Sequence, residues 1–276
     1  MSNSWLLSYP RSGNTWVRYI TENILQCPTI GYWPDGPTRA VPSQVNTHKY
    51  YIDSPICYKA TWGEEVDSAS KPILKRHFFK DMSPETGDKL LFIIRNHKEC
   101  ILRHTMPVIA EFPERFLNVC YEELLSYMQN LQAYDEYPGP KLLVYYEDLL
   151  STPEQQILEI IDFLGENSSP ETLERYHKFL KDYGSHTEES RQIYAKNGVP
   201  PITNGKSELV FYSNLRDPGN TSPGPPMQVD HRNATLDLAT IVNFQTSAVK
   251  IDTRARHYDE NLYVKYLSRY TGNKNE

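Results

Sequence analysis

Four short runs of apolar residues, each ending in a polar cluster, constrain the fold of this 276-residue chain most strongly. The runs cover residues 5–7, 72–74, 90–94 and 141–145. Continuous apolar runs, unlike alternating ones, are typical of parallel strands that are buried on both faces. Helical patterns lie between them. The sequence therefore predicts an α/β fold: a doubly wound parallel sheet with helices on both faces and right-handed crossovers.

Amphipathic helices are expected after the first run and at several later places. The first helix is marked by Trp16, Val17, Ile20 and Ile24 on one face. The second covers residues 122–134 and carries Leu124, Leu125, Met128 and Leu131. Further helices are expected over residues 171–181, 188–195, 235–244 and 259–270.

The best-marked helix follows the fourth run. Thr152 is expected to cap it, Pro153 to take its first position, and Gln155 to complete a capping box. Gly165 is expected to end it. The apolar face is formed by Ile157, Ile161 and Leu164.

Residues 198–231 are dense in proline and glycine, which favours an irregular loop. Long loops in compact domains commonly form lids over binding sites, so we expect a lid here. No repeat or clear boundary divides the chain, and residues 1–276 are therefore expected to form a single domain with this one irregular lid loop.

Composition excludes several classes of protein. Twenty-nine Lys and Arg stand against 35 Asp and Glu, and the net charge of −6 argues against a nucleic-acid binder. The four cysteines lack CxxC spacing, so reduced thiols are expected rather than a disulfide frame or a zinc site. No run approaches the roughly 20 apolar residues of a membrane span, and no secretory signal is visible. We expect no membrane partner and a cytoplasmic protein; the oligomeric state stays open.

Basic residues gather where the expected strands end, although the chain is acidic overall. The first run leads through a tight turn, residues 8–16, into a helix, which is typical of a P-loop-like anion site without the Walker A spacing. The cations gathered at the strand ends are Arg11, which lies in this turn, and Lys75, Arg76, Arg95 and Lys98. Carboxyl ends of parallel strands share one edge of a sheet, so a ligand with more than one anionic group is expected there.

These segments together resemble the sulfotransferases that use 3′-phosphoadenosine 5′-phosphosulfate, of the cytosolic type and similar to small microbial natural-product members. Residues 9–16, Tyr-Pro-Arg-Ser-Gly-Asn-Thr-Trp, are similar to that family's 5′-phosphosulfate loop, Tyr-Pro-Lys-Ser-Gly-Thr-Thr-Trp. Residues 75–77 resemble its Lys-Thr-His motif, and residues 92–103 its 3′-phosphate segment, Arg-Asn-Pro-Lys-Asp. Residues 146–149, Tyr-Glu-Asp-Leu, are similar to a further motif that precedes a helix.

The resemblance implies in-line transfer of a sulfuryl group, with adenosine 3′,5′-bisphosphate as the second product and no metal. It implies that His77 is the general base, that Lys75 stabilises charge on the transferring group, and that Arg11 neutralises the leaving group. The donor would be held by Arg11, Ser12, Gly13, Asn14, Thr15, Trp16, Arg95, Arg103, Tyr146 and Lys206. Within this set, Arg95 would bind the 3′-phosphate, and Trp16 and Tyr146 would contact the adenine.

The chain departs from the family pattern at three places. Arg11 replaces a lysine of the loop, and a guanidinium can neutralise charge but cannot act as an acid. Arg103 replaces a serine that contacts the 3′-phosphate, where it could form a stronger bidentate contact. The C-terminal phosphate loop has no clear match; Lys206 and Arg216 are stand-in candidates.

The acceptor is predicted to be a small molecule. In the family, the segment before the histidine strand shapes the acceptor pocket, and here it combines aromatic and acidic side chains, which suit an organic cation. The candidates are Trp33, Tyr51, Trp62, Phe79, Asp53 and Glu64. We expect a polar natural product such as a guanidinium alkaloid, sulfated on oxygen or nitrogen. In the alternative interpretation, these aromatic side chains belong to the core and the acidic ones to a solvated face. A phenol, a sterol or a glycopeptide aglycone also stays open as the acceptor.

Two other classes are kept as alternatives. A P-loop-like small-molecule kinase would need a Walker A Lys-Ser/Thr and an aspartate that holds Mg²⁺ after a strand, and neither is visible. A non-catalytic nucleotide-binding protein or scaffold would have no use for His77 beside Lys75 at a strand end.

Overall fold

The computed structural model describes residues 2–27, 29–31, 73–111, 113–165, 169–185 and 238–271. The predicted lid at 198–231, the predicted helix at 188–195 and most of the predicted acceptor segment lie outside these ranges.

A five-stranded sheet in the order β2-β3-β1-β4-β5 forms the centre of the described chain. Its strands are β1 (Ser4–Ser8), β2 (Thr29–Gly31), β3 (Ile73–Arg76), β4 (Lys89–Ile94) and β5 (Lys141–Tyr145). Every pair is parallel, and β1 lies between β3 and β4. The four apolar runs of the sequence thus form four of the strands, as predicted. The edge strand β2 was not predicted.

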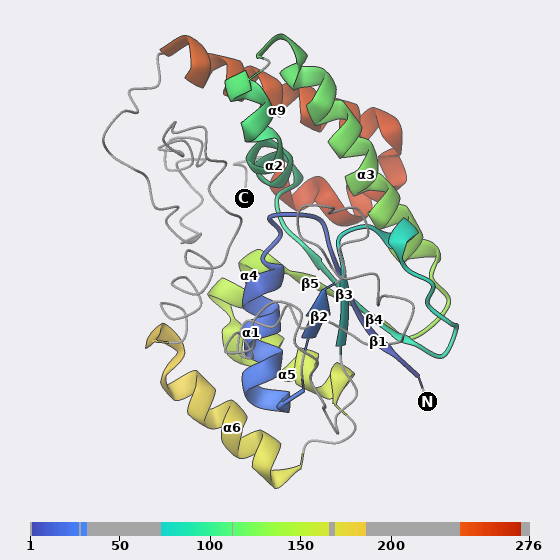
Figure 1. Cartoon of the computed structure of the whole chain (residues 1–276), viewed down its shortest axis with the longest axis vertical. Helices are drawn as coiled ribbons and strands as arrows, with labels where there is room; N and C mark the ends of the chain where they lie inside the picture. Colours follow the sequence, from blue (N-terminus) through green and yellow to red (C-terminus); the bar gives the residue numbers. More distant parts are fainter. Residues whose placement is uncertain are drawn as a thin grey trace, which may run out of the picture.

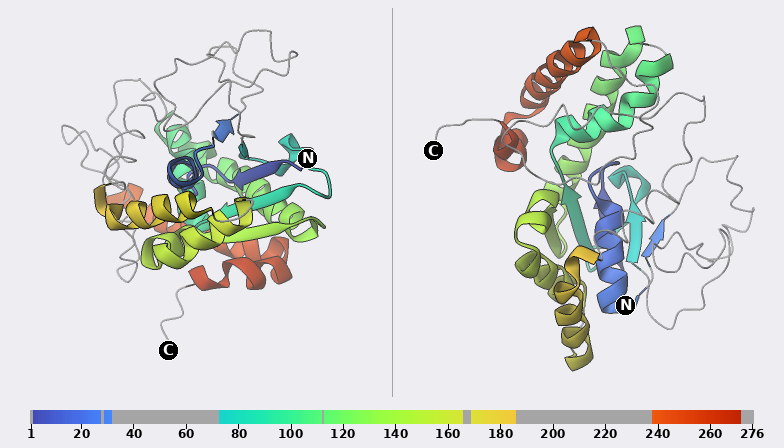
Figure 2. Two further views of the ribbon diagram at one scale, coloured as in Figure 1. Left: turned by 90° about the horizontal axis from the view of Figure 1, so that it is seen from below. Right: turned by 90° about the vertical axis from the view of Figure 1, so that its left-hand side faces the viewer.

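Helices cover both faces of the sheet, which confirms the doubly wound α/β fold. One group, α1 (Asn14–Leu25), α5 (Pro153–Leu164) and α6 (Pro170–Lys181), packs on one face; the other, α2 (His97–Glu111), α3 (Phe116–Glu136) and α9 (Leu238–Tyr258), packs on the opposite face (Figure 1). Figure 2 shows the same two groups from two further directions.

Short helical elements complete the described chain. Two are single turns of 3-10 helix, η3 (Phe79–Asp81) and η4 (Pro113–Arg115), and α4 (Tyr146–Ser151) directly follows β5. The C-terminal part continues from α9 through α10 (Glu260–Leu262), a π-helical segment η5 (Tyr263–Leu267) and a 3-10 turn η6 (Ser268–Tyr270).

Successive residues of a strand point to opposite faces, and both sets are buried here. On β1, Leu7 packs toward α2, α3 and α9, whereas Leu6 packs toward α1, α5 and α6. On β4, Phe92 packs on the same side as Leu7, and Leu91 packs on the same side as Leu6. All four side chains are almost completely inaccessible to solvent. Burial on both faces explains why these runs are apolar without alternation.

The edge strand β2 is held to α1 by buried polar groups. The Arg18 side chain donates from Nε to Thr29 Oγ1 at 2.8 Å and from Nη2 to the Thr29 carbonyl at 3.2 Å. Glu22 Oε1 accepts the Thr29 N–H at 3.1 Å. A three-residue strand has too little hydrophobic pattern to be seen in the sequence, and these side-chain contacts stabilise it.

The structure corrects several local predictions. Lys75 and Arg76 are the last residues of β3, not residues that follow it. The capping box at the start of α5 is wrong: Thr152 Oγ1 donates to the Asp148 carbonyl at 3.1 Å, and Gln155 Nε2 donates to Glu159 at 2.9 Å. The α4 turn directly before Thr152 places that carbonyl within reach of the hydroxyl.

Two helix predictions also need correction. Leu125 is 43% exposed instead of packed, although its neighbours Leu124 and Met128 are buried. The predicted helix at 235–244 continues to Tyr258, because Ile251 and Ala255 extend its buried face. Within the described ranges, no helix is both long enough and apolar enough to cross a membrane.

Candidate active site

The four polar motifs that follow the apolar runs meet at one edge of the sheet. The strands β3, β1, β4 and β5 are neighbours in this order and run parallel, so their carboxyl ends lie side by side. This edge therefore carries Lys75 and His77, then the β1–α1 turn, then Arg95, and finally Tyr146. The fold thus brings the strand-end motifs of the sequence to one edge of the sheet, as predicted.

The turn between β1 and α1 depends on two left-handed residues, Arg11 with φ 69° and Gly13 with φ 94°. The Ser12 N–H donates to the Tyr9 carbonyl at 3.2 Å, and Gly13 is the N-cap of α1. A Cβ on Gly13 would come within 2.2 Å of the Tyr146 ring, so only glycine fits. The turn thus starts α1 at the carboxyl edge of the sheet, and the N-terminus of a helix carries partial positive charge that favours an anion.

Tyr146 and Trp16, the predicted adenine contacts, are both largely buried. The Arg95 guanidinium lies 4.6 Å from the centroid of the Tyr146 ring. Trp16 stacks on Tyr19 with centroids 5.7 Å apart and meets the edge of Tyr183 at 5.5 Å. Tyr146 thus borders the turn and Arg95 at once, while Trp16 packs mainly within the α1 and α6 side of the core.

Lys75 lies in β3 and His77 directly follows the strand, and the two side chains contact one another. His77 Nδ1 donates to the Ser8 carbonyl at 2.8 Å, which leaves Nε2 as the acceptor nitrogen. Lys75 Nζ donates to this Nε2. Burial and the Lys75 ammonium hold the pKa of His77 well below its usual range. A neutral imidazole with an unprotonated Nε2 is therefore favoured just after β3.

The backbone that carries His77 is held by Asn130, which the sequence analysis did not identify. Asn130 Nδ2 donates to the His77 carbonyl at 2.8 Å, and its Oδ1 accepts the Phe79 N–H at the same distance. Asn130 lies on α3 and is 2% exposed. The side-chain amide of Asn130 thus binds one carbonyl and one N–H of the chain just after β3. These two hydrogen bonds fix the direction in which this chain leaves the sheet.

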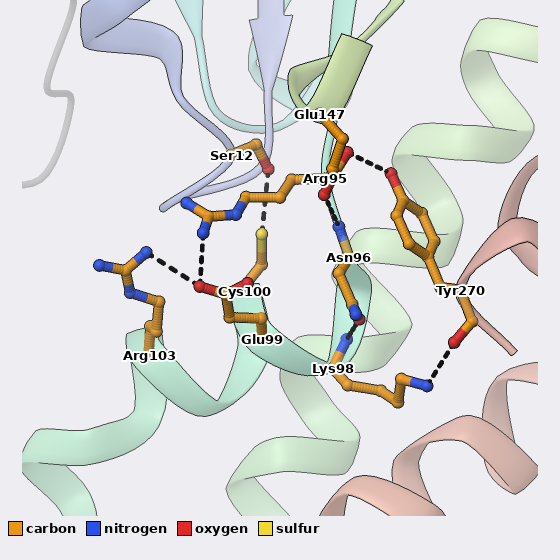
Figure 3. Close-up of polar contacts among 9 residues, drawn as sticks. All are labelled: Ser12, Arg95, Asn96, Lys98, Glu99, Cys100, Arg103, Glu147 and Tyr270. Atoms are coloured by element: carbon orange, nitrogen blue, oxygen red, sulfur yellow. Dashed lines mark hydrogen bonds and ion pairs between the residues drawn. The ribbon is translucent and has the colours of Figure 1, made fainter. Parts of the chain in front are cut away.

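Arg95 and Arg103, the two predicted 3′-phosphate ligands, are both buried and both contact Glu99. Arg95 Nη2 lies 2.5 Å from Glu99 Oε1, and Arg103 Nη1 lies 3.2 Å from the same oxygen. Figure 3 shows the carboxylate of Glu99 between the two guanidinium groups. The structure therefore brings both guanidinium groups to the same carboxylate oxygen.

A second carboxylate, the half-buried Glu147, joins this edge to the C-terminal segment (Figure 3). Its Oε1 accepts the Asn96 N–H at 3.2 Å and its Oε2 accepts the Tyr270 hydroxyl at 2.8 Å. Lys98 Nζ donates to the Tyr270 carbonyl at 2.8 Å. Burial raises the pKa of Glu147. The chain just after Arg95 is thus fastened to η6, which lies more than 170 residues later.

Behind the turn, Tyr9 and His104 share a third acid, Glu123 on α3. The Tyr9 hydroxyl donates to Glu123 Oε2 at 2.7 Å, and His104 Nε2 lies 3.9 Å from Glu123 Oε1. Burial lowers the pKa of His104. Tyr9 is completely buried and packs against Tyr127. The contacts of Tyr9 with Glu123 and Tyr127 thus anchor the start of the turn in the core.

The remaining predicted site residues divide into two sets. Phe79 is described, and its ring packs against the core near Tyr137, with centroids 6.5 Å apart. The others lie outside the described residues: Trp33, Tyr51, Asp53, Trp62, Glu64, Lys206 and Arg216. The side chain of Thr15 is likewise not described. Among the described residues, no group of three or more His, Cys, Asp or Glu side chains could hold a metal ion.

Comparison with known proteins identifies the family. The sulfotransferase domain model matches residues 2–183, and the chain belongs to this family. It is 26% identical over 190 residues to Sulfotransferase 1B1 of Mus musculus, covering 62% of this chain and 60% of that protein. It is 24% identical over 213 residues to Sulfotransferase 2A6 of Mus musculus, covering 72% of each. The chain spans about three fifths of the length of several curated relatives, including Sulfotransferase 1C2 of Homo sapiens.

Solved structures with a related arrangement share little sequence. Mouse sulfotransferase SULT7A1, complexed with PAP, is 13% identical, with 95% of this chain and 86% of that chain covered and a TM-score of 0.46. The sulfotransferase domain from the curacin biosynthetic pathway is 14% identical, with 72% and 98% covered and a TM-score of 0.36.

Proposed function

We propose that the protein, as a single-domain enzyme, transfers a sulfuryl group from 3′-phosphoadenosine 5′-phosphosulfate to a small-molecule acceptor. The accepting atom is a hydroxyl oxygen or an amine or carbamoyl nitrogen. The observation that carries this proposal is the pairing of His77 Nε2 with Lys75 at the end of β3, next to the anion-binding turn. A base and a cation at this edge are what transfer to a nucleophilic acceptor needs.

The edge fits the donor in two respects. A side chain at Gly13 would collide with the Tyr146 ring. With glycine there, the backbone N–H groups of the turn can bind the 5′-phosphosulfate. Arg95 and Arg103 supply two guanidinium groups one strand away, and guanidinium groups bind phosphate in bidentate fashion. Two separate anion sites match a donor with two separate anionic groups.

The chemistry then divides among residues of this chain. The donor supplies the sulfuryl group. His77 Nε2 takes the proton of the acceptor as its oxygen or nitrogen bonds to sulfur, and the hydrogen bond from Nδ1 to Ser8 keeps the ring in the correct tautomer. Lys75 and Arg11 oppose the negative charge that builds up as the sulfur–oxygen bond to the bisphosphate breaks.

The kinase alternative gains no support from this site. Asp148, the aspartate after β5, is paired with Arg269, whose Nη2 and Nη1 lie 2.6 and 3.0 Å from its two oxygens. A carboxylate held in this bidentate way is committed to the arginine and is poorly placed to hold Mg²⁺.

For the acceptor we propose a small, polar natural product with a cationic group, since the acceptor segment of the sequence combines aromatic and acidic residues. A screen with guanidinium alkaloids and neutral phenols side by side tests this. Faster turnover of the phenols would contradict a cationic acceptor without affecting the proposed reaction.

Thermal unfolding with ligands tests the donor. Adenosine 3′,5′-bisphosphate at 100 times its Kd should stabilise the protein by about 2.7 kcal/mol, and ATP with Mg²⁺ should stabilise it less. Stabilisation by ATP with Mg²⁺ alone would overturn the proposal in favour of a kinase.

A further inference from the structure

Glu99 places a negative charge where the proposed donor needs positive charge. Its Oε1 contacts Arg95 at 2.5 Å and Arg103 at 3.2 Å, and the three side chains are drawn together in Figure 3. The side chains of Arg95 and Arg103 are 5% and 8% exposed, whereas that of Glu99 is 29% exposed. The carboxylate thus reaches both buried cations from a more accessible position.

The spacing along the chain explains this arrangement. Glu99 and Arg103 are four residues apart on α2 and so share one face of this helix. Arg95 lies between the end of β4 and the start of α2, and its guanidinium reaches the same carboxylate oxygen. Two guanidinium groups so close together repel one another, and each loses hydration on burial. A carboxylate between them offsets both costs, which gives Glu99 a clear role in the stability of the ligand-free protein.

The same carboxylate opposes a phosphate at this place. A phosphate would bind the same two guanidinium groups that Glu99 contacts through Arg95 Nη2 and Arg103 Nη1, and like charges side by side repel. We propose that Glu99 competes with the 3′-phosphate of the donor for Arg95 and Arg103, so that donor binding exchanges one anion for another. This inference rests on the proposed function, and it adds to it a residue that limits affinity.

The competition has a use in turnover. The donor and the product adenosine 3′,5′-bisphosphate carry the same 3′-phosphate, so a site with two arginines and no counter-ion would retain the product. Product release limits the rate of many enzymes. Glu99 favours release of the bisphosphate by binding the arginines again. Because Arg103 replaces the family's serine and adds a positive charge, the site needs this competing negative charge.

Calorimetric titration of four variants with two ligands tests the proposal. The ligands are adenosine 3′,5′-bisphosphate and adenosine 5′-monophosphate, which lacks the 3′-phosphate. Glu99→Gln should bind the bisphosphate about 10-fold more tightly than the wild type, which corresponds to about 1.4 kcal/mol. Its affinity for the monophosphate should be unchanged, and its ligand-free melting temperature should fall.

Two further variants serve as controls. Glu99→Asp keeps the charge and should bind the bisphosphate within about twofold of the wild type. If Glu99→Gln does not fold, Glu99→Ser, which also removes the charge, takes its place and should show the same tighter binding. Glu122→Gln removes an equivalent charge from an exposed position on α3 and should change neither affinity.

The outcomes separate this inference from the proposed function. Equal or weaker bisphosphate binding by the neutral variants would show that Glu99 only positions Arg95, and would overturn the inference while the function stands. A wild-type protein that binds no bisphosphate would overturn both.

Discussion

Lys75 donates a hydrogen bond to Nε2 of His77, the atom that in our proposal takes the acceptor proton. Lys75 lies in β3 and His77 directly follows it, and the second nitrogen of the ring donates to the Ser8 carbonyl at 2.8 Å. Burial and the Lys75 ammonium lower the pKa of the imidazole, so in our proposal the base stays neutral until Lys75 engages the anionic donor. One lysine thus links donor charge to the state of the base.

The pH dependence of transfer should report this link. Because burial and Lys75 lower the pKa of His77, wild-type kcat should stay level as the pH falls to 6.5 and decline only below it. In Lys75→Met the ring loses the nearby positive charge, its pKa rises, and the acid limb of the profile should move to higher pH while kcat falls overall. Profiles of kcat against pH for both proteins check this. An acid limb at the same pH in both would contradict it.

Asn130 should act on the rate through the position of His77. Asn130→Asp keeps the acceptor for the Phe79 N–H but places a carboxylate against the His77 carbonyl. We expect kcat to fall about 10-fold, since small displacements of a catalytic group are costly, with bisphosphate affinity unchanged. Asn118→Ala, at an exposed position of the same helix, is the control. A lower melting temperature with normal kcat would reduce Asn130 to a purely structural role.

Gly13→Ala should destabilise the fold and abolish donor binding together. The new Cβ would meet the Tyr146 ring, and a φ of 94° is itself unfavourable for alanine. Strain of this kind costs roughly 1–3 kcal/mol, measurable by urea unfolding. Gly87→Ala is the matched control, because a Cβ there meets nothing within 4 Å. Equal stability of the two variants would refute the packing of the turn against Tyr146.

Arg95→Ala should raise the KM for the donor far more than it lowers kcat. Loss of one partner of a buried charge-assisted contact costs about 2–5 kcal/mol. Steady-state kinetics at varied donor concentration measure this, with Arg254→Ala on the exposed side of α9 as control. An unchanged KM would mean that the 3′-phosphate is held elsewhere.

The strands and the polar groups at their ends could be predicted because their signals are local. A buried parallel strand needs a continuous apolar run, and the residues that follow it necessarily lie at the sheet edge, so Arg95 and His77 could be placed from sequence. The β1–α1 turn is equally local, since Gly13 and the start of the helix are contiguous in the chain.

Residues that act from a distance could not be found in this way. Asn130 lies 53 positions after His77 and is a single polar residue in an amphipathic helix. Glu147 meets Tyr270 across 123 positions. Nothing local marks either contact, because both depend on how helices pack against the sheet. Local patterns also mislead where tertiary partners compete, as at Thr152, whose hydroxyl prefers the Asp148 carbonyl.

Transfer of labelled sulfate from ³⁵S-labelled 3′-phosphoadenosine 5′-phosphosulfate tests the central claim most directly. Wild-type protein and His77→Ala are assayed with phenols, sterols and guanidinium alkaloids, and bisphosphate binding is measured in parallel. We predict labelled product from the wild type, a rate about 10²–10⁴-fold lower in His77→Ala, and equal bisphosphate affinity in both. Undiminished transfer by His77→Ala, or no labelled product from the wild type with any acceptor, would contradict the account.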